Sequence, residues 1–266
     1  MKIIGIEGNA TGNKNLPVQF NEEIRPDLIK RAVLTIQTNR RQRYGASPDA
    51  GKRASAKLSR RRHDYRGAYG IGISRVPRKI MSRRGTRMNW VGAFAVGTVG
   101  GRRAHPPKSE KIWEKKINKK ESNKAVRSAI AATVSSEYVK EHGHLLPKNY
   151  PFIIDNKFES LEKTQEVIKA LEKIGIKEEL ERVSVKKVRA GKGKLRGRPY
   201  KTRKGPLIVV GKDCSLVKSA KNISGIDVVE AKNLNAELLA PGAKPGRLTL
   251  WTASSIDLIE KERLFT

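Results

Sequence analysis

Clusters of arginine and lysine side chains are the main functional groups in this chain, and such clusters bind phosphate. Between Arg40 and Glu110, 71 residues hold 19 Lys/Arg and only 3 Asp/Glu, a net charge of +16. Between Arg182 and Lys204, 23 residues hold 11 Lys/Arg and no acidic residue. The other 172 residues carry only +4 of the total +31. Because clustered cations neutralise phosphates and release counterions, the sequence predicts a nearly neutral body with two segments that bind nucleic acid.

The first of these segments contains 15 Arg and 4 Lys. Arginine offers a planar fork that pairs with phosphate and stacks on bases, whereas lysine is a point charge. The predicted RNA-binding residues are 26 of the 30 cations in the two segments: Arg40, Arg41, Arg43, Arg53, Arg60, Arg61, Arg62, Arg66, Arg75, Arg78, Lys79, Arg83, Arg84, Arg87, Arg102 and Arg103 in the first, and Lys186, Lys187, Arg189, Lys192, Lys194, Arg196, Arg198, Lys201, Arg203 and Lys204 in the second.

A run of this length and charge, interrupted by ten glycines, has too little apolar surface to offset its own ordering entropy, so we expect a polyanion to order it. Five aromatic residues punctuate it: Tyr44, Tyr65, Tyr69, Trp90 and Phe94. Each could stack on an unpaired base or anchor the loop locally, and the sequence does not separate the two. Paired out and back, the loop could reach beyond roughly 60 Å, which suits penetration of a folded RNA.

Motifs of nucleotide-dependent and nucleophilic enzymes are absent. Gly70 and Gly72 are followed by Arg75 where a dinucleotide-binding fingerprint needs a third glycine, and no phosphate-binding P-loop or nucleophile elbow occurs. The sequence therefore argues against an enzyme and against a cofactor or small-molecule substrate.

Metal-binding patterns are missing as well. The single Cys214 excludes an intramolecular disulfide and a cysteine-based zinc site. His142 and His144 would point apart in a strand and lack a third ligand, so structural or capping roles are expected, while His63 and His105 in the basic segment are expected to meet RNA.

The body around these segments reads as α/β. Apolar runs predict strands at 2–8, 16–20, 152–154, 207–210, 227–230 and 248–251. Helical periodicity predicts helices from Pro26, from Asn118 (with Glu121 completing a capping box) to about Lys140, over 161–174 and 215–222, and from Ser254 to Leu264, with a helical turn over 234–239. Short apolar strands that alternate with helices predict a three-layer α/β/α body with a mostly parallel sheet.

We expect a single domain, 1–266, with a basic loop inserted at 43–108 and a second basic segment at 182–206. No apolar run is long enough for a membrane span or a signal peptide, so a cytoplasmic protein is expected.

Four stretches carry a family resemblance. SRVPRKIMSRRGTR (74–87) and GGRRAHPPK (100–108) resemble the extended loop of the fourth large-subunit ribosomal protein. NKAVRSAIAA (123–132) and VRAGKGKLRGRPYKTRKGP (188–206) resemble the archaeal and eukaryotic form of that family, and the last is the most specific. The resemblance spans essentially the whole chain, and the absence of a long basic C-terminal extension resembles the archaeal branch.

The resemblance implies a Rossmann-like body on the large ribosomal subunit and a loop inserted into 23S rRNA. It also implies that the loop tip, here about 73–87, helps to form a constriction of the polypeptide exit tunnel beside the twenty-second large-subunit protein. The charged tip candidates are then Arg75, Arg78, Arg83 and Arg84. The alternatives are a regulatory RNA-binding protein that acts off the ribosome and, least favoured, a nucleotide-dependent enzyme.

Overall fold

The computed structural model describes residues 1–266 as two units. The α/β unit consists of Met1–Arg40 and Glu114–Thr266, and the loop unit consists of Arg41–Trp113. The α/β unit contains a six-stranded sheet in the order β2-β1-β5-β10-β8-β9. Its strands are β1 (Lys2–Ile4), β2 (Ala10–Asn13), β5 (Ile153–Ile154), β8 (Leu207–Val210), β9 (Asp227–Glu230) and β10 (Thr249–Thr252), so the strand predicted at 2–8 is shorter than expected. Every neighbouring pair is parallel except β1 and β2, which confirms the predicted mostly parallel sheet.

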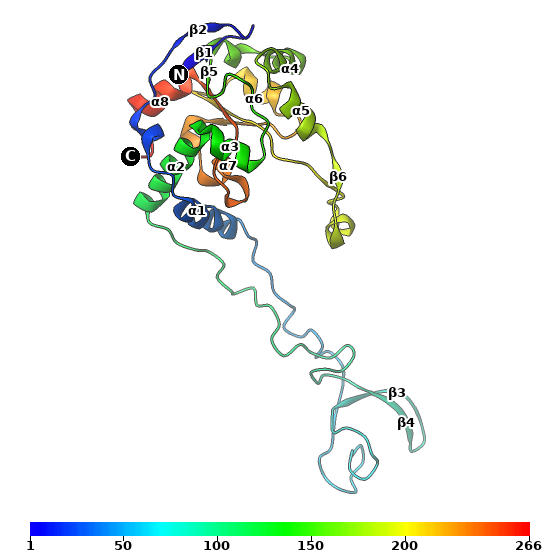
Figure 1. Ribbon diagram of the computed structural model, residues 1–266. Helices are drawn as coiled ribbons and strands as arrows, with labels where there is room; N and C mark the ends of the chain where they lie inside the picture. The colour runs from blue at the N-terminus through cyan, green and yellow to red at the C-terminus, as the bar shows by residue number, and fades with distance from the viewer. The chain divides into compact units, whose positions relative to one another are not determined.

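Helices cover both faces of this sheet (Figure 1). They are α1 (Pro26–Asn39), α2 (Lys119–Val134), α3 (Ser136–His142), α4 (Thr164–Lys173), α5 (Lys177–Ser184), α6 (Ser215–Ala220), α7 (Ala236–Leu239) and α8 (Ala253–Lys261). Leu207 and Val209 of β8 pack in a core with α1, α2, α7 and α8, whereas Ile208 and Val210 pack in a second core with α4 and α6. Successive strand residues face opposite sides, so two covered faces require the unbroken apolar run seen in β8. The predicted three-layer architecture is confirmed.

The predicted strand at 16–20 is wrong. Residues Val18–Asn21 form a 3₁₀ turn, and the antiparallel partner of β1 is instead β2. Pro17 has no N–H to give to a ladder. The Phe20 ring meets the Trp251 indole edge to face at 5.0 Å, and the Gln19 amide donates to the carbonyls of Ile259 and Leu264. Tertiary packing therefore decides the conformation of this segment.

The single helix predicted from Asn118 to Lys140 is two helices, α2 and α3, that meet at Ser135, which is in the extended conformation. The Thr133 hydroxyl donates to the Ile130 carbonyl just before the break, and such back-bonding competes with the helical ladder. The predicted capping box is also wrong, because the Asn118 side chain makes no cap hydrogen bond and Glu121 pairs with Arg31 at 3.1 Å. Gly143 ends α3 with φ of 94°, as predicted.

Two boundaries in the C-terminal half differ from prediction. The helical signal over 161–174 corresponds to α4, and the unpredicted α5 follows it after Gly175. The last helix begins at Ala253 rather than Ser254, because β10 runs directly into α8 and the Thr252 hydroxyl accepts the Ser255 N–H as the N-cap.

In the loop unit a hydrogen-bonded hairpin forms where the sequence predicted only an extended loop. Strands β3 (Arg78–Arg84) and β4 (Arg87–Gly92) pair antiparallel, with Arg84 opposite Arg87. Gly85 has φ of 58° at the first central position of the turn, where glycine is favoured. Only Ala68 and Ala93 are buried apolar side chains in this unit, so the predicted lack of a core is confirmed.

The second basic segment forms a smaller hairpin. Strands β6 (Lys187–Val188) and β7 (Tyr200–Lys201) pair antiparallel, and a 3₁₀ segment, Gly191–Arg196, connects them. The Arg189 guanidinium donates to the carbonyls of Arg198 and Tyr200, so one of the predicted RNA-binding cations also braces the hairpin.

Candidate nucleic-acid interface

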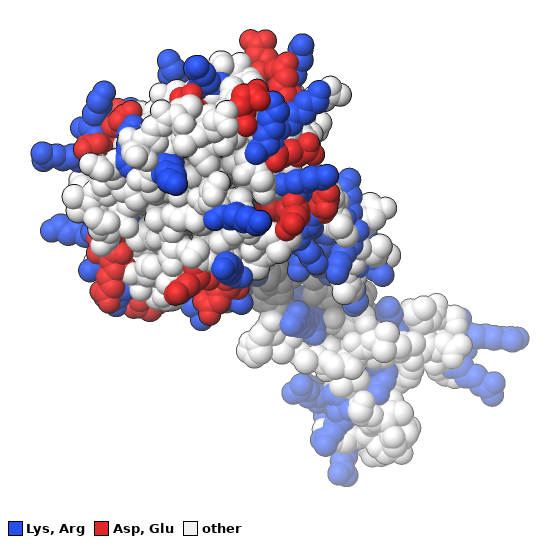
Figure 2. Space-filling view, turned by 45° about the horizontal axis from the view of Figure 1, so that its top comes forward, with Lys and Arg blue, Asp and Glu red and all other residues white.

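None of the 26 predicted RNA-binding cations is buried. Five are half-buried, namely Arg66, Arg78, Lys79, Arg102 and Arg189, and the rest are exposed. In Figure 2 the body shows red and blue side chains interspersed, whereas the atoms of the loop unit in view are blue and white. Exposed cations without neighbouring carboxylates are available to an external polyanion, which is the electrostatic requirement for phosphate binding.

Carboxylates of the α/β unit engage Arg40 and Lys204. Arg40 lies 2.6 Å from Glu237, and Lys204 lies 3.0 Å from Asp227. These two cations are therefore partly neutralised by the body itself, a pairing that charge counting along the chain could not detect.

The structure separates the four tip candidates into two pairs. Arg83 and Arg84 lie at the turn end of the β3–β4 hairpin, together with Arg87, which was not among the tip candidates. Arg78 lies at the opposite end of the hairpin, where its guanidinium donates to the carbonyls of Ser74 and Val76. Arg75 precedes it in the chain. The pairing register, which the sequence did not reveal, makes this distinction.

The five aromatic residues of the loop all have an arginine close to the ring. Arg75 lies 5.4 Å from the Tyr69 ring centre, Arg78 lies 5.5 Å from Trp90, and Arg102 lies 5.8 Å from Phe94. Tyr65 faces both Arg66 and Arg83, and Tyr44 faces Arg41. Each contact is a cation–π interaction that holds a guanidinium in place. These contacts support the local-anchor interpretation, and Tyr44, Tyr65, Tyr69 and Phe94 remain more than one-third exposed for further stacking.

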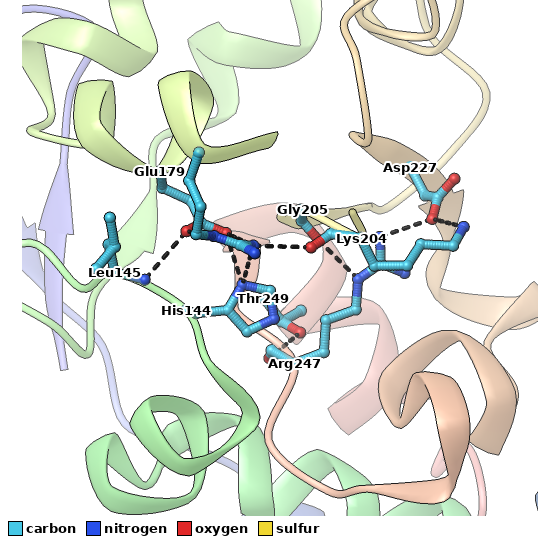
Figure 3. A network of polar contacts seen from close by, with 9 residues as sticks. His144, Leu145, Glu179, Lys204, Gly205, Asp227, Arg247 and Thr249 are labelled. Atoms are coloured by element: carbon cyan, nitrogen blue, oxygen red, sulfur yellow. Dashed lines mark hydrogen bonds and ion pairs between the residues drawn. The ribbon is translucent and has the colours of Figure 1, made fainter. Parts of the chain in front are cut away.

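A polar network connects the second basic segment to the α/β unit (Figure 3). On one side, Glu179 of α5 is fully buried and accepts hydrogen bonds from Arg182, from His144 at 2.6 Å and from the Leu145 N–H. Arg182 in turn donates to the Lys204 carbonyl at 2.9 Å. Arg182, the first cation of the predicted basic segment, therefore joins its two ends rather than facing outward.

On the other side of the network, Arg247 is 1% exposed. Its guanidinium donates to the Gly205 carbonyl, the Leu238 carbonyl and Asp227, the last at 2.6 Å (Figure 3). The consecutive carbonyls of Lys204 and Gly205 thus accept hydrogen bonds from two different arginines, Arg182 and Arg247. The end of the second basic segment is anchored where β8 begins.

The paired histidines have structural roles, as predicted, but not in a strand. His142 is the last residue of α3, and its ring stacks on that of His144 at 5.0 Å. Burial, together with the neighbouring His144, lowers the pKa of His142. The His144 Nδ1 is hydrogen-bonded to Glu179, and the His142 Nε2 is hydrogen-bonded to the Pro241 carbonyl. Nothing in the sequence pattern connects His144 with a residue 35 positions later.

Comparison with known proteins adds the decisive observation. Residues 15–262 match the sequence model of the Ribosomal protein L4/L1 family. The chain belongs to this family. It is 50% identical to the large ribosomal subunit protein uL4 of Nanoarchaeum equitans over 264 residues, 99% of this chain and 98% of that protein. It is 44% identical to the uL4 proteins of Archaeoglobus fulgidus, over 97% of both chains, and of Methanocaldococcus jannaschii, over 98% of both. The sequence-based resemblance to an archaeal L4-type protein is therefore confirmed.

No helix of this L4-family chain combines the length and apolarity needed to cross a bilayer.

We expect amides of the L4-family loop between about 45 and 105 to exchange rapidly in the isolated full-length chain and to become protected when RNA binds. The reason is that only two alanines are buried there, so local opening costs little. Hydrogen exchange with mass spectrometry measures this directly, with the buried strand β8 as the slow internal reference. Strong protection of the loop without RNA would contradict the expectation.

Proposed function

We propose that this protein is a structural constituent of the large ribosomal subunit that binds 23S rRNA through its basic loop and its second basic segment. The observation that carries the proposal is the distribution of charge: none of the 26 predicted RNA-binding cations is buried, and the 172 residues outside the two segments are nearly neutral. Membership in the Ribosomal protein L4/L1 family points the same way. That family is a structural one, which favours a non-enzymatic role in the cytoplasmic ribosome.

We further propose that the β3–β4 hairpin contributes to the wall and constriction of the polypeptide exit tunnel, next to the twenty-second large-subunit protein. Arg83, Arg84 and Arg87 at its turn end are the side chains proposed to lie there. A two-stranded hairpin without an apolar core needs outside support, and packed RNA around it would supply this support.

Crosslinking of RNA to protein in cell extract, with mass spectrometric mapping of the linked residues, tests this proposal. Links from 73–87 to large-subunit rRNA, and co-sedimentation of the protein with large subunits after a moderate salt wash, are expected. Links confined to messenger RNA, with the protein absent from washed subunits, would contradict it and favour the alternative of a regulatory RNA-binding protein.

The second basic segment offers a separate prediction. Replacing Lys187, Lys192, Lys194, Arg196 and Lys201 with glutamine removes five phosphate partners, so rRNA affinity should fall. The negative slope of log K against log salt concentration should become shallower by up to about 4–5. The thermal midpoint should stay nearly constant, because these side chains are exposed and Arg182, which braces the segment, is retained. Filter binding across a salt series and thermal unfolding measure the two quantities. A large fall in the midpoint would show that the segment supports the body instead.

A further inference from the structure

The loop unit contains a pocket that the proposed rRNA contacts do not explain. It has a volume of ≈ 790 Å³ and lies between residues 103–108 on one side and Tyr44, Lys111 and Trp113 on the other. Cavities of this size are in the range that holds one small organic ligand, about 300–1,000 Å³.

Backbone contacts hold the walls of the pocket together. The Ala46 N–H donates to the Pro107 carbonyl at 2.9 Å, and the Lys111 N–H donates to the Lys108 carbonyl at 3.2 Å. A Cβ at Gly45 would lie 2.4 Å from the Ser109 nitrogen, so the close approach of the two chain segments requires glycine at this position. The pocket is thus built by main-chain geometry rather than by mobile side chains alone.

Two stacked aromatic rings form one side of the pocket. The Tyr44 and Trp113 rings are 6.0 Å apart and nearly parallel, at 14°. The Arg41 guanidinium lies 3.7 Å from the Trp113 ring centre, and the Lys111 ammonium lies 4.4 Å from it. Tyr44, Arg41 and Lys111 thus contact the Trp113 ring. Tyr44 is 50% exposed and offers free ring surface to a planar ligand.

Basic side chains surround the pocket. Arg103, Lys108 and Lys111 line the pocket against a single carboxylate, Glu110, so the local charge also favours an anion.

We propose that this pocket receives one unpaired nucleotide of RNA, with its base against Tyr44 and its phosphate among Arg103, Lys108 and Lys111. The proposal rests on the proposed RNA-binding function and specifies which form of RNA this pocket of the loop unit selects. A base inside a duplex is covered by its stacking neighbours and cannot enter, so the pocket distinguishes single-stranded or bulged RNA from a continuous helix.

The test compares a fluorescein-labelled single-stranded RNA dodecamer with the same sequence as a duplex, each titrated with the full-length chain and followed by anisotropy. Tyr44→Ala should weaken single-strand binding by between about 5-fold and 150-fold, which is the value of one stacked base. Duplex binding should change less than about two-fold, since phosphate contacts dominate there. Tyr44→Phe retains the ring and should behave like the unmodified protein.

Tyr200→Ala is the matched control, because Tyr200 is 58% exposed in the second basic segment and lies outside the pocket. It should leave the difference between single strand and duplex unchanged. Equal effects of Tyr44→Ala on both RNAs, or no effect on either, would overturn the pocket proposal while RNA binding stands. Failure of the unmodified protein to bind either RNA would instead refute the proposed function.

A free mononucleotide shares the chemistry of the proposed ligand, so AMP forms a further arm of the experiment. If AMP bound in a Tyr44-dependent manner while RNA binding did not depend on Tyr44, the pocket would be a free-nucleotide site and the proposal would fail. Ultraviolet crosslinks from the single-stranded dodecamer to Tyr44 or Trp113, absent with the duplex, are the expected direct confirmation.

Discussion

Replacing Glu179 with glutamine is expected to destabilise the α/β unit by about 3–5 kcal/mol, the usual consequence of breaking a buried ion pair. The Glu179 side chain is fully buried, and its partners Arg182 and His144 are 15% and 1% exposed. Glutamine retains the volume but not the charge, so the half-buried Arg182 guanidinium would lack a carboxylate partner. Denaturant unfolding of the full-length chain at pH 7 measures the free energy of unfolding.

Glu181→Gln is the matched control, since Glu181 lies two residues away on the same helix and is exposed. A charge change there should alter the free energy of unfolding by no more than about 0.5 kcal/mol. If the two variants were equally stable, the network of Glu179 would contribute nothing to the fold.

The Glu179 network also makes stability depend on pH. Burial by itself raises the pKa of Glu179, but hydrogen bonds from Arg182, His144 and the Leu145 N–H outweigh it, so the pKa lies below its ordinary value of 4.5. A carboxylate with a lowered pKa stabilises the folded state fully above its unfolded pKa and loses this contribution as pH falls through the folded one. The stability difference between the unmodified chain and Glu179→Gln should therefore shrink below about pH 4.5.

Replacing Arg247 with methionine is expected to have an effect of similar size, about 3–5 kcal/mol. The Arg247 guanidinium satisfies two carbonyls, those of Gly205 and Leu238, and faces Asp227. Methionine fills much of the space but leaves those carbonyls unpaired, and buried unpaired acceptors are costly. Burial by itself raises the pKa of Asp227, but the charge of Arg247 and the hydrogen bonds from Arg247 and Lys204 together lower it below its ordinary value, so the folded protein holds the pair ionised.

Lys204→Met is the natural comparison, because Lys204 contacts the same Asp227 oxygen at 3.0 Å as Arg247 does at 2.6 Å. The Lys204 side chain is 56% exposed, so solvent screens its ion pair and its loss should cost no more than about 1 kcal/mol. Thermal unfolding of both variants tests the contrast. Equal losses would mean that burial does not set the strength of these two ion pairs.

The two networks bear on function because they fix the ends of the second basic segment. Arg182 holds the Lys204 carbonyl, and Arg247 holds the next carbonyl, that of Gly205. A segment of eleven cations repels itself, so it remains in place only if its ends are tied to the body. Arg182, which lies in the second basic segment, and Arg247, which lies outside it, therefore position the other cations of the segment for the proposed RNA contacts.

The layout of this protein follows from the order of residue types along the chain. Uneven charge separates the two basic segments from the body, because the number of Lys, Arg, Asp and Glu residues in each segment is set by the sequence alone. The apolar run of β8 and the helical stripe of α1, with Ile29, Ala32 and Val33 buried, are determined by the periods of strand and helix. The mostly parallel sheet and the L4-type family membership follow from patterns that lie along the chain.

Tertiary structure alone decided which cations face outward and which are structural. Arg182 and Arg196 are indistinguishable in sequence, yet one pairs with the buried Glu179 and the other is exposed. Likewise, Phe20 turns the segment predicted as a strand toward Trp251, and the hairpin register separates Arg78 from Arg84. These outcomes depend on contacts between residues far apart in the chain, such as His144 with Glu179, and no local pattern encodes the free energy of such contacts.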